Sequence, residues 1–260
     1  TKERVQDEFC KMLTCKHPIM AMELLRKIGA MHYVIPELEE TYSMTQNEYH
    51  FGTVWEHTMM VLEGTKDDNM ILRISALLHD IGKIRVCTED DGKIHFLKHE
   101  LKSGEMIDEL LRPLKFSNEI IKEVTFLVRN HMICKTWGSE CEYMKDKKLR
   151  RFQYECKTEE RFRNLMTIID ADNNAYAADK CMPKQVEFIL SRTEAMKAEG
   201  SAMFGYKLPL TGKEIMDLKG IKPGSAVKEC LDYLMKIAFA NPLRKKEEFV
   251  KHLLGYRLQK

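Results

Sequence analysis

Apolar residues recur at intervals of three and four positions along most of this 260-residue chain. That spacing places them on one face of an α-helix, whereas a half-buried strand requires strict alternation. The chain is therefore expected to be all-α, a helical bundle with a C-terminal helical tail. Helices are predicted over residues 3–14, 19–30, 54–64, 69–81, 99–112, 118–132, 159–179, 184–199, 211–218, 225–238 and 245–254.

One short stretch departs from the helical period. Residues 85–88 and 93–96 flank Asp90-Asp91-Gly92, and an Asp-Gly pair between such runs is typical of a tight hairpin. We expect a small β-hairpin there. Gly82, which follows the helix over 69–81, is a candidate for that helix's C-terminal cap.

Composition excludes several classes of protein. Apolar residues make up 44% and charged residues 32%, which argues against extensive disorder. No apolar run approaches the roughly 20 residues that span a bilayer, so no membrane partner is expected. The eight cysteines are scattered without a C-x-x-C pair, which argues against a zinc–thiolate site and suits a reducing, cytoplasmic location. The net charge of +2 is too small to imply nucleic-acid binding by itself.

Two predicted helices place a polar side chain within an apolar face. In the helix over 118–132, His131 falls at the centre of the apolar stripe. In the helix over 159–179, Asp172 lies within roughly 40° of the inward direction, whereas Asp170 lies roughly 120° away. A carboxylate on an apolar face is costly to desolvate, so Asp172 is expected to have a metal or another partner.

Further positions put a His or an Asp where an inward-facing group would lie. His57 and His99 each align with apolar residues of their own helices, and the adjacent His79 and Asp80 follow the small-residue side of theirs. Taken singly, each has an ordinary explanation as a hydrogen-bonded core residue. Together they are hard to attribute to chance, because one metal site removes the desolvation cost of all of them.

The candidate metal ligands are His57, His79, Asp80, His99, His131 and Asp172. Imidazole and carboxylate without thiolate suit a divalent ion such as Fe, Mn, Ni, Co, Zn or Mg, and the sequence does not choose among them. The Asp80 carboxylate would be able to bridge two ions that clamp a phosphoryl group, so one or two ions are expected. Lys83, one turn beyond Asp80, is suited to hold a phosphate oxygen, although a solvated helix-end lysine is the alternative. Asp80 and Lys83 are therefore the candidates for catalysis.

The order and spacing of these residues resemble the H…HD…D pattern of the HD-domain metal-dependent phosphohydrolase superfamily. His57, then Ala76-Leu77-Leu78-His79-Asp80-Ile81-Gly82-Lys83, then Ala171-Asp172 carry the resemblance. His99 and His131 match the two further histidines of its binuclear members. The resemblance implies an HD-type helical bundle with phosphohydrolase activity.

The resemblance extends to the HD and C-terminal portion of bacterial tRNA nucleotidyltransferases, the CCA-adding enzymes. It is carried by Gln46-Asn47-Glu48-Tyr49-His50 with residues 54–58, 94–100, 114–118, 3–9 and 210–224, and so covers nearly the whole chain. It implies a neck-like helical segment over residues 1–45, an HD domain over 46–200 and a helical tail over 201–260. A composition shift between Gly200 and Pro209 fits the last boundary.

The nucleotide-adding head of that family is not visible. Asp170-Ala171-Asp172 is formally a D-x-D motif, but it lies on a predicted helix without the family's Gly-Ser turn. We therefore expect a fragment of the longer enzyme or a headless relative. The resemblance then implies hydrolysis of phosphorylated nucleotides, cyclic 2′,3′-phosphates or RNA ends. The alternative is a tRNA-binding body with a vestigial HD site.

Substrate and RNA contacts have weaker signals. Lys83, Arg129 and Asn173 are the candidates for binding the substrate. A basic run over residues 145–151 is a candidate surface for tRNA, which the resemblance implies as a partner through phosphate contacts. A solvated charged face is the more common explanation of such a run.

Overall fold

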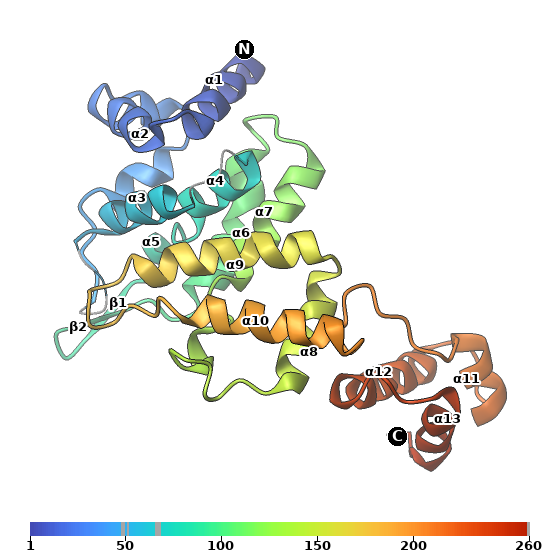
Figure 1. Cartoon of the computed structure of the whole chain (residues 1–260). Helices are drawn as coiled ribbons and strands as arrows, with labels where there is room; N and C mark the ends of the chain where they lie inside the picture. Colours follow the sequence, from blue (N-terminus) through green and yellow to red (C-terminus); the bar gives the residue numbers. More distant parts are fainter. Residues whose placement is uncertain (48–49, 51, 66–68, 259–260) are drawn as a thin grey trace. The chain divides into compact units, whose positions relative to one another are not determined.

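The computed structural model describes residues 1–47, 50, 52–65 and 69–258 (Figure 1). Glu48 and Tyr49 of the expected 46–50 motif lie outside them. The chain forms two compact units, residues 1–140 with 163–186, and residues 141–162 with 187–260. Both units are built from helices, so the all-α prediction is confirmed. The expected boundaries at residues 45 and 200 stay a prediction.

The first unit contains most of the elements that place the candidate ligands. In chain order they are α1 (Lys2–Thr14), α2 (Pro18–Lys27), the 3₁₀ helices η1 (Ala30–Tyr33) and η2 (Pro36–Thr41), α3 (Val54–Gly64), α4 (Met70–Leu78), α5 (Lys83–Val86), β1 (Thr88–Asp90), β2 (Lys93–His95), α6 (His99–Leu111), α7 (Asn118–Asn130), the 3₁₀ helix η3 (Lys135–Trp137) and most of α9 (Glu159–Asn174). The second unit contains α8 (Asp146–Cys156), most of α10 (Gln185–Ala198), α11 (Gly212–Lys219), α12 (Ser225–Ala240) and α13 (Lys246–Gly255).

Packing among α3, α4, α6 and α7 forms the core of the first unit (Figure 1). Helix α3 begins at a capping box, in which Thr53 and Glu56 satisfy each other's backbone N–H groups. Its last residue, Gly64, lies so close to α9 that an added Cβ would be 3.0 Å from the Ala171 Cβ. The close approach of the two helices brings His57 beside Asp172.

The helix predicted over residues 69–81 is shorter than expected. Helix α4 ends at Leu78, and residues 79–82 form a turn. The prediction that Gly82 caps this helix is wrong, because its φ of −65° is helical rather than left-handed. Position 82 requires a residue without a side chain for another reason. An added Cβ would lie 2.4 Å from the Ser103 backbone nitrogen and 2.5 Å from the His99 carbonyl oxygen, so α6 packs directly on the turn.

The predicted hairpin is present but begins later than expected. Strands β1 and β2 pair antiparallel, with Thr88 opposite His95. Asp91 and Gly92 between them have φ of 49° and 71°, as a two-residue turn matching the strands' twist requires. Residues 85 and 86 belong instead to α5, because the chain continues the helical turn begun at Lys83.

Helix α8 of the second unit was not predicted, because its first turns appear in the sequence as a run of charge. Leu149, Phe152 and Cys156 form its buried stripe. Arg150, counted in the basic run, is buried and donates to the Phe239 and Ala240 carbonyl oxygens at 3.4 and 3.1 Å. It satisfies carbonyl groups at the end of α12 and is unavailable to a surface ligand.

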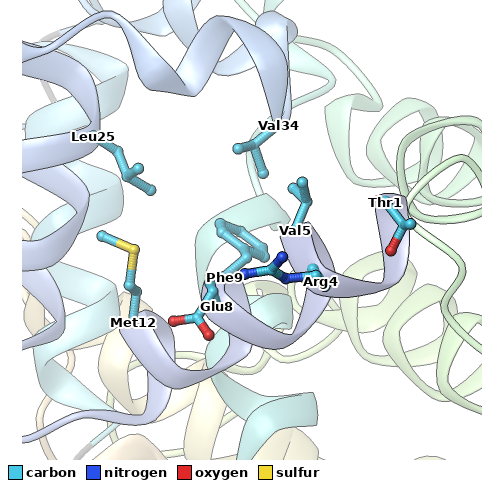
Figure 2. A pocket seen from close by; sticks show the side chains of 8 residues that line it. All are labelled: Thr1, Arg4, Val5, Glu8, Phe9, Met12, Leu25 and Val34. Carbon is cyan, nitrogen blue, oxygen red and sulfur yellow. The ribbon is translucent and has the colours of Figure 1, made fainter.

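Helix α1 borders a hollow of about 370 Å³ in the first unit (Figure 2). Apolar side chains make most of its wall, and Arg4 and Glu8 contribute its charges. The residues that line it are Thr1, Arg4, Val5, Glu8, Phe9, Met12, Leu25 and Val34. Among the described residues, those that line it include no His or Cys. Within the described residues, every helix is too short or too polar to cross a bilayer.

Candidate metal centre

The six candidate ligands come from five places in the first unit. His57 lies on α3, His79 and Asp80 in the turn after α4, His99 at the first residue of α6, His131 directly after α7, and Asp172 on α9. All six are buried. Asp170, by contrast, is partly exposed, so the helical-face argument that separated it from Asp172 agrees with the structure.

One group of donors surrounds the His57 imidazole. Its Nε2 lies 3.1 Å from Asp172 Oδ1, 3.3 Å from His79 Nε2 and 3.5 Å from Asp80 Oδ2. The His79 Nε2 lies 3.2 Å from the same Asp80 oxygen. Two atoms that each bind one ion at about 2.1 Å lie about 3.0–4.2 Å apart. These donors therefore have the spacing that a metal ion requires.

A second group forms around the other Asp80 oxygen. Asp80 Oδ1 lies 3.1 Å from His99 Nε2 and 3.8 Å from His131 Nε2. The three ligand atoms lie within 4.8 Å of one another, as do those of His57, His79 and Asp172. Asp80 therefore offers one oxygen to each group, which is the arrangement of a carboxylate bridging two ions.

All four histidines are anchored through their other ring nitrogen. The Nδ1–H groups of His79, His99 and His131 donate to the carbonyl oxygens three residues earlier, at 2.8, 2.9 and 2.7 Å. His57 Nδ1 donates to the Ala175 carbonyl oxygen at 3.2 Å. Such bonds fix the tautomer that leaves Nε2 free as an electron-pair donor and orient the ring toward a metal. Residues and geometry thus fit a divalent ion.

Buried carboxylates at this site are kept ionised by their neighbours. Burial alone would raise the pKa of Asp80, but His79 and Lys83 hold that pKa well below its usual range. Burial acts likewise on Asp172, whose pKa is held well below its usual range by Lys135 and His57. Both side chains are therefore in the charged form that binds a cation.

The histidines differ in their protonation. Burial and the neighbouring His79 lower the pKa of His131 to about 3, so its ring is neutral and able to bind a metal at neutral pH. Burial opposes the charged form of His79, but the carboxylate of Asp80 raises the pKa of that ring above its ordinary value. A metal would take the place of this proton between the two side chains.

Three residues that the sequence analysis did not assign a role hold Lys83 in place. The Lys83 ammonium lies 2.6 Å from Asp80 Oδ2 and donates to Gln46 Oε1 at 2.7 Å. It also lies 3.4 Å from His50 Nε2, whose ring donates from Nδ1 to Asn47 Oδ1 at 2.9 Å. Burial and Lys83 lower the pKa of His50 to about 3, so its Nε2 is an acceptor. Only the resemblance quoted around residues 46–50 had drawn attention to this segment.

Lys135 was also missed by the sequence analysis. Its ammonium lies 2.9 Å from Asp172 Oδ2 and donates to Asn173 Oδ1 at 2.8 Å. Asn173, a candidate for substrate binding, donates in turn to Gln185 Oε1 at 3.0 Å. Arg129, the other such candidate, is exposed and lays its side-chain stem across Gly104 of α6. In the described part of the chain we find no contact between Arg129 and the ligands.

The basic run of the second unit borders a groove of about 690 Å³. Lysines and Arg151 from α8 face Lys236 of α12, and Tyr154 and Phe239 add aromatic surface. The groove also includes two carboxylates. Its positive members are Lys145, Lys147, Lys148, Arg151 and Lys236. A phosphate backbone would find complementary charge there.

Comparison with known families agrees with the geometry. Residues 47–173 match the model of the HD domain. The chain contains an HD domain. Residues 1–41 match a family described as a probable RNA and SrmB-binding site of polymerase A. The HD match spans His57 to Asp172, so every candidate ligand lies within it.

Relatives among characterised proteins are tRNA nucleotidyltransferases. The chain is 28% identical over 236 residues to the A-adding tRNA nucleotidyltransferase of Deinococcus radiodurans, a match that covers 88% of the chain and 52% of the relative. It is 27% identical over 266 residues to the CC-adding enzyme of Thermus thermophilus, covering 98% of the chain and 57% of the relative. A multifunctional CCA protein of Actinobacillus pleuropneumoniae is 31% identical over 142 residues, covering 52% of the chain and 34% of the relative. The chain thus spans about half the length of the first two relatives.

Proposed function

We propose that the HD domain of this chain is a phosphohydrolase that depends on two divalent metal ions. The observation that carries the proposal is the position of the Asp80 carboxylate between two groups of histidines. Its Oδ1 lies 3.1 Å from His99 Nε2, and its Oδ2 lies 3.2 Å from His79 Nε2. A hydrogen-bonded core carboxylate does not need histidines around both of its oxygens. A bridging ligand does.

Each part of the site has a role in this reaction. When bound, divalent ions lower the pKa of water and neutralise charge on a phosphoryl group. Asp80 would be shared by the two ions, with His57, His79 and Asp172 as the further donors of one group and His99 and His131 as those of the other. Lys83, fixed against Asp80, offsets the negative charge of that carboxylate. The substrates proposed are phosphomonoesters or cyclic 2′,3′-phosphodiesters on nucleotides or RNA ends.

The test combines metal analysis with a substrate screen. The chain is reconstituted with Mn, Ni, Co or Mg, its metal content is measured by mass spectrometry, and hydrolysis of cyclic 2′,3′-AMP, nucleotides and tRNA ends is followed. Wild-type protein should take up about two ions, and Asp80→Asn should lose both metal and activity. Asp91→Asn, an exposed change in the hairpin turn, is the matched control. Absence of metal after reconstitution would refute the proposal.

A second candidate function is supported by the match over residues 1–41 and by the basic groove between α8 and α12. In this alternative the chain is a tRNA-binding body whose HD site has no catalytic use. It predicts tRNA binding that persists in Asp80→Asn and falls in Lys147→Glu/Lys148→Glu. A wild-type chain that binds tRNA and shows neither metal nor hydrolysis would favour it.

A further inference from the structure

Each of the two carboxylates of the metal centre has a lysine ammonium beside it, Lys83 at Asp80 and Lys135 at Asp172. The two lysines differ in how many of their N–H groups can bind a ligand. Lys83 has three partners for its three N–H groups, Asp80, Gln46 and His50, and is 1% exposed. A lysine has three donors, so this one has none left for a substrate. Its contacts fit a fixed counter-charge.

Lys135 has a donor to spare. Its ammonium donates to Asn173, forms an ion pair with Asp172 at 2.9 Å, and lies 4.0 Å over the Tyr176 ring. Within the described residues no further oxygen or nitrogen accepts from it. Its side chain is 14% exposed, against 2% for Asp172 and 3% for Asp80. Lys135 is therefore more accessible to a ligand than either carboxylate.

A buried hydrogen-bond network holds Lys135 in this position. Asn173 accepts from Lys135 and donates to Gln185. Gln185 in turn donates to the backbone carbonyl oxygens of Cys134 and Gly138, at 3.0 and 2.8 Å, on either side of the lysine's own turn. Asn173 and Gln185 are both fully buried. The side chain and the backbone of the turn are thus fixed through the same pair of amides, as a preorganised binding group requires.

The face of Tyr176 completes the setting. The ring lies beneath the ammonium and is itself placed by a backbone bridge with His50. A cation over an aromatic face is attracted by the ring but gives up no hydrogen-bond donor to an acceptor atom. The third N–H of Lys135 therefore stays available to an anion.

From these contacts we infer that Lys135, rather than Lys83, binds a phosphate oxygen of the substrate beside Asp172. The inference rests on the proposed metal-dependent hydrolysis, because the phosphate is one held at the metal centre. Asn173 and Gln185 are then positioning residues, which act through Lys135 and do not touch the substrate.

The test measures binding of inorganic phosphate to the metal-loaded chain by calorimetry. Lys135→Met should retain metal and weaken phosphate binding about 10- to 100-fold, the loss expected for a hydrogen bond to a charged group. Lys135→Arg should restore part of the affinity. Lys122→Met, an exposed change on α7, is the matched control and should change nothing.

The outcomes separate this inference from the proposed function. Unchanged phosphate affinity in metal-loaded Lys135→Met would overturn the inference and leave the proposed function intact. Loss of metal from Lys135→Met, with wild-type metal content in Lys135→Arg, would make the lysine part of the metal site and also overturn it. A wild-type chain that takes up no metal would refute both. A larger loss of phosphate affinity in Lys83→Met than in Lys135→Met would reverse the assignment.

Discussion

The substitution Gly82→Ala should disturb one of the two donor groups of the metal centre more than the other. The backbone at Gly82 has an ordinary helical conformation, so alanine adds no strain in φ. The added Cβ would lie 2.4 Å from the Ser103 nitrogen, whereas ordinary contacts begin at 3.4 Å. Helix α6 must therefore move by the difference, about 1 Å, and the atoms in the way are backbone atoms that cannot rotate aside.

The movement acts on one donor group more than on the other. His99 begins α6, and its Nε2 lies 3.1 Å from Asp80 Oδ1. A shift of about 1 Å exceeds the roughly 0.2 Å tolerance of metal–ligand distances. His57, His79 and Asp172 lie on other elements. Metal content should consequently fall from about two ions to about one.

The same substitution should reduce stability. Overpacking costs about 1–3 kcal/mol, and loss of the Gly82 N–H to Ser103 Oγ bond, 2.8 Å long, adds about 1 kcal/mol. The sum of about 2–4 kcal/mol corresponds to a fall in Tm of roughly 4–16 °C for a chain of this size. Calorimetry and metal analysis measure the two effects. Gly255→Ala, at a position where an added Cβ meets nothing, is the control. A variant with two ions and wild-type Tm would refute the reasoning.

Two further predictions concern single side chains. Asp172→Asn should reduce metal uptake to about one ion while Asp170→Asn leaves it near wild type, because only Asp172 is buried among the histidines; the reverse result in metal analysis would contradict the assigned helix face. Burial raises the pKa of Cys156 to about 12, and the thiolate is the reactive form, so iodoacetamide at pH 8 should label exposed Cys15 first and Cys156 only after unfolding. Rapid labelling of Cys156 in the folded chain, detected by peptide mass spectrometry, would contradict that burial.

Helical period and face reasoning predicted most of the site, because they concern side chains whose elements are regular. Asp172 lies within α9, and His131 directly follows the last turn of α7, so each kept the direction that its helix implied. The pair His79-Asp80 did not, since α4 ends at Leu78 and a turn sets their directions. There the sequence pattern indicated the ligands, while the turn over residues 79–82 set their geometry.

Lys135 could not be predicted by the same reasoning. It begins a 3₁₀ turn after α7, where no helical face is defined, and its partners come from positions 172 and 173. Contacts between segments so far apart leave no periodic signal in a single sequence. The helix over residues 146–156 was missed for a different reason. The charged residues of this segment obscured the apolar stripe of the helix, whose buried residues begin at Leu149. Arg150 of this helix donates to the Ala240 carbonyl oxygen.

Charge at the centre constrains what it binds. Two buried carboxylates, Asp80 and Asp172, face two ammonium groups, Lys83 and Lys135, so these four side chains balance. Two divalent ions would add about four positive charges. An excess of this size in a buried site is costly unless anions enter. A phosphate ester supplies them, and the side of the site on which Lys135 is exposed is where it should enter.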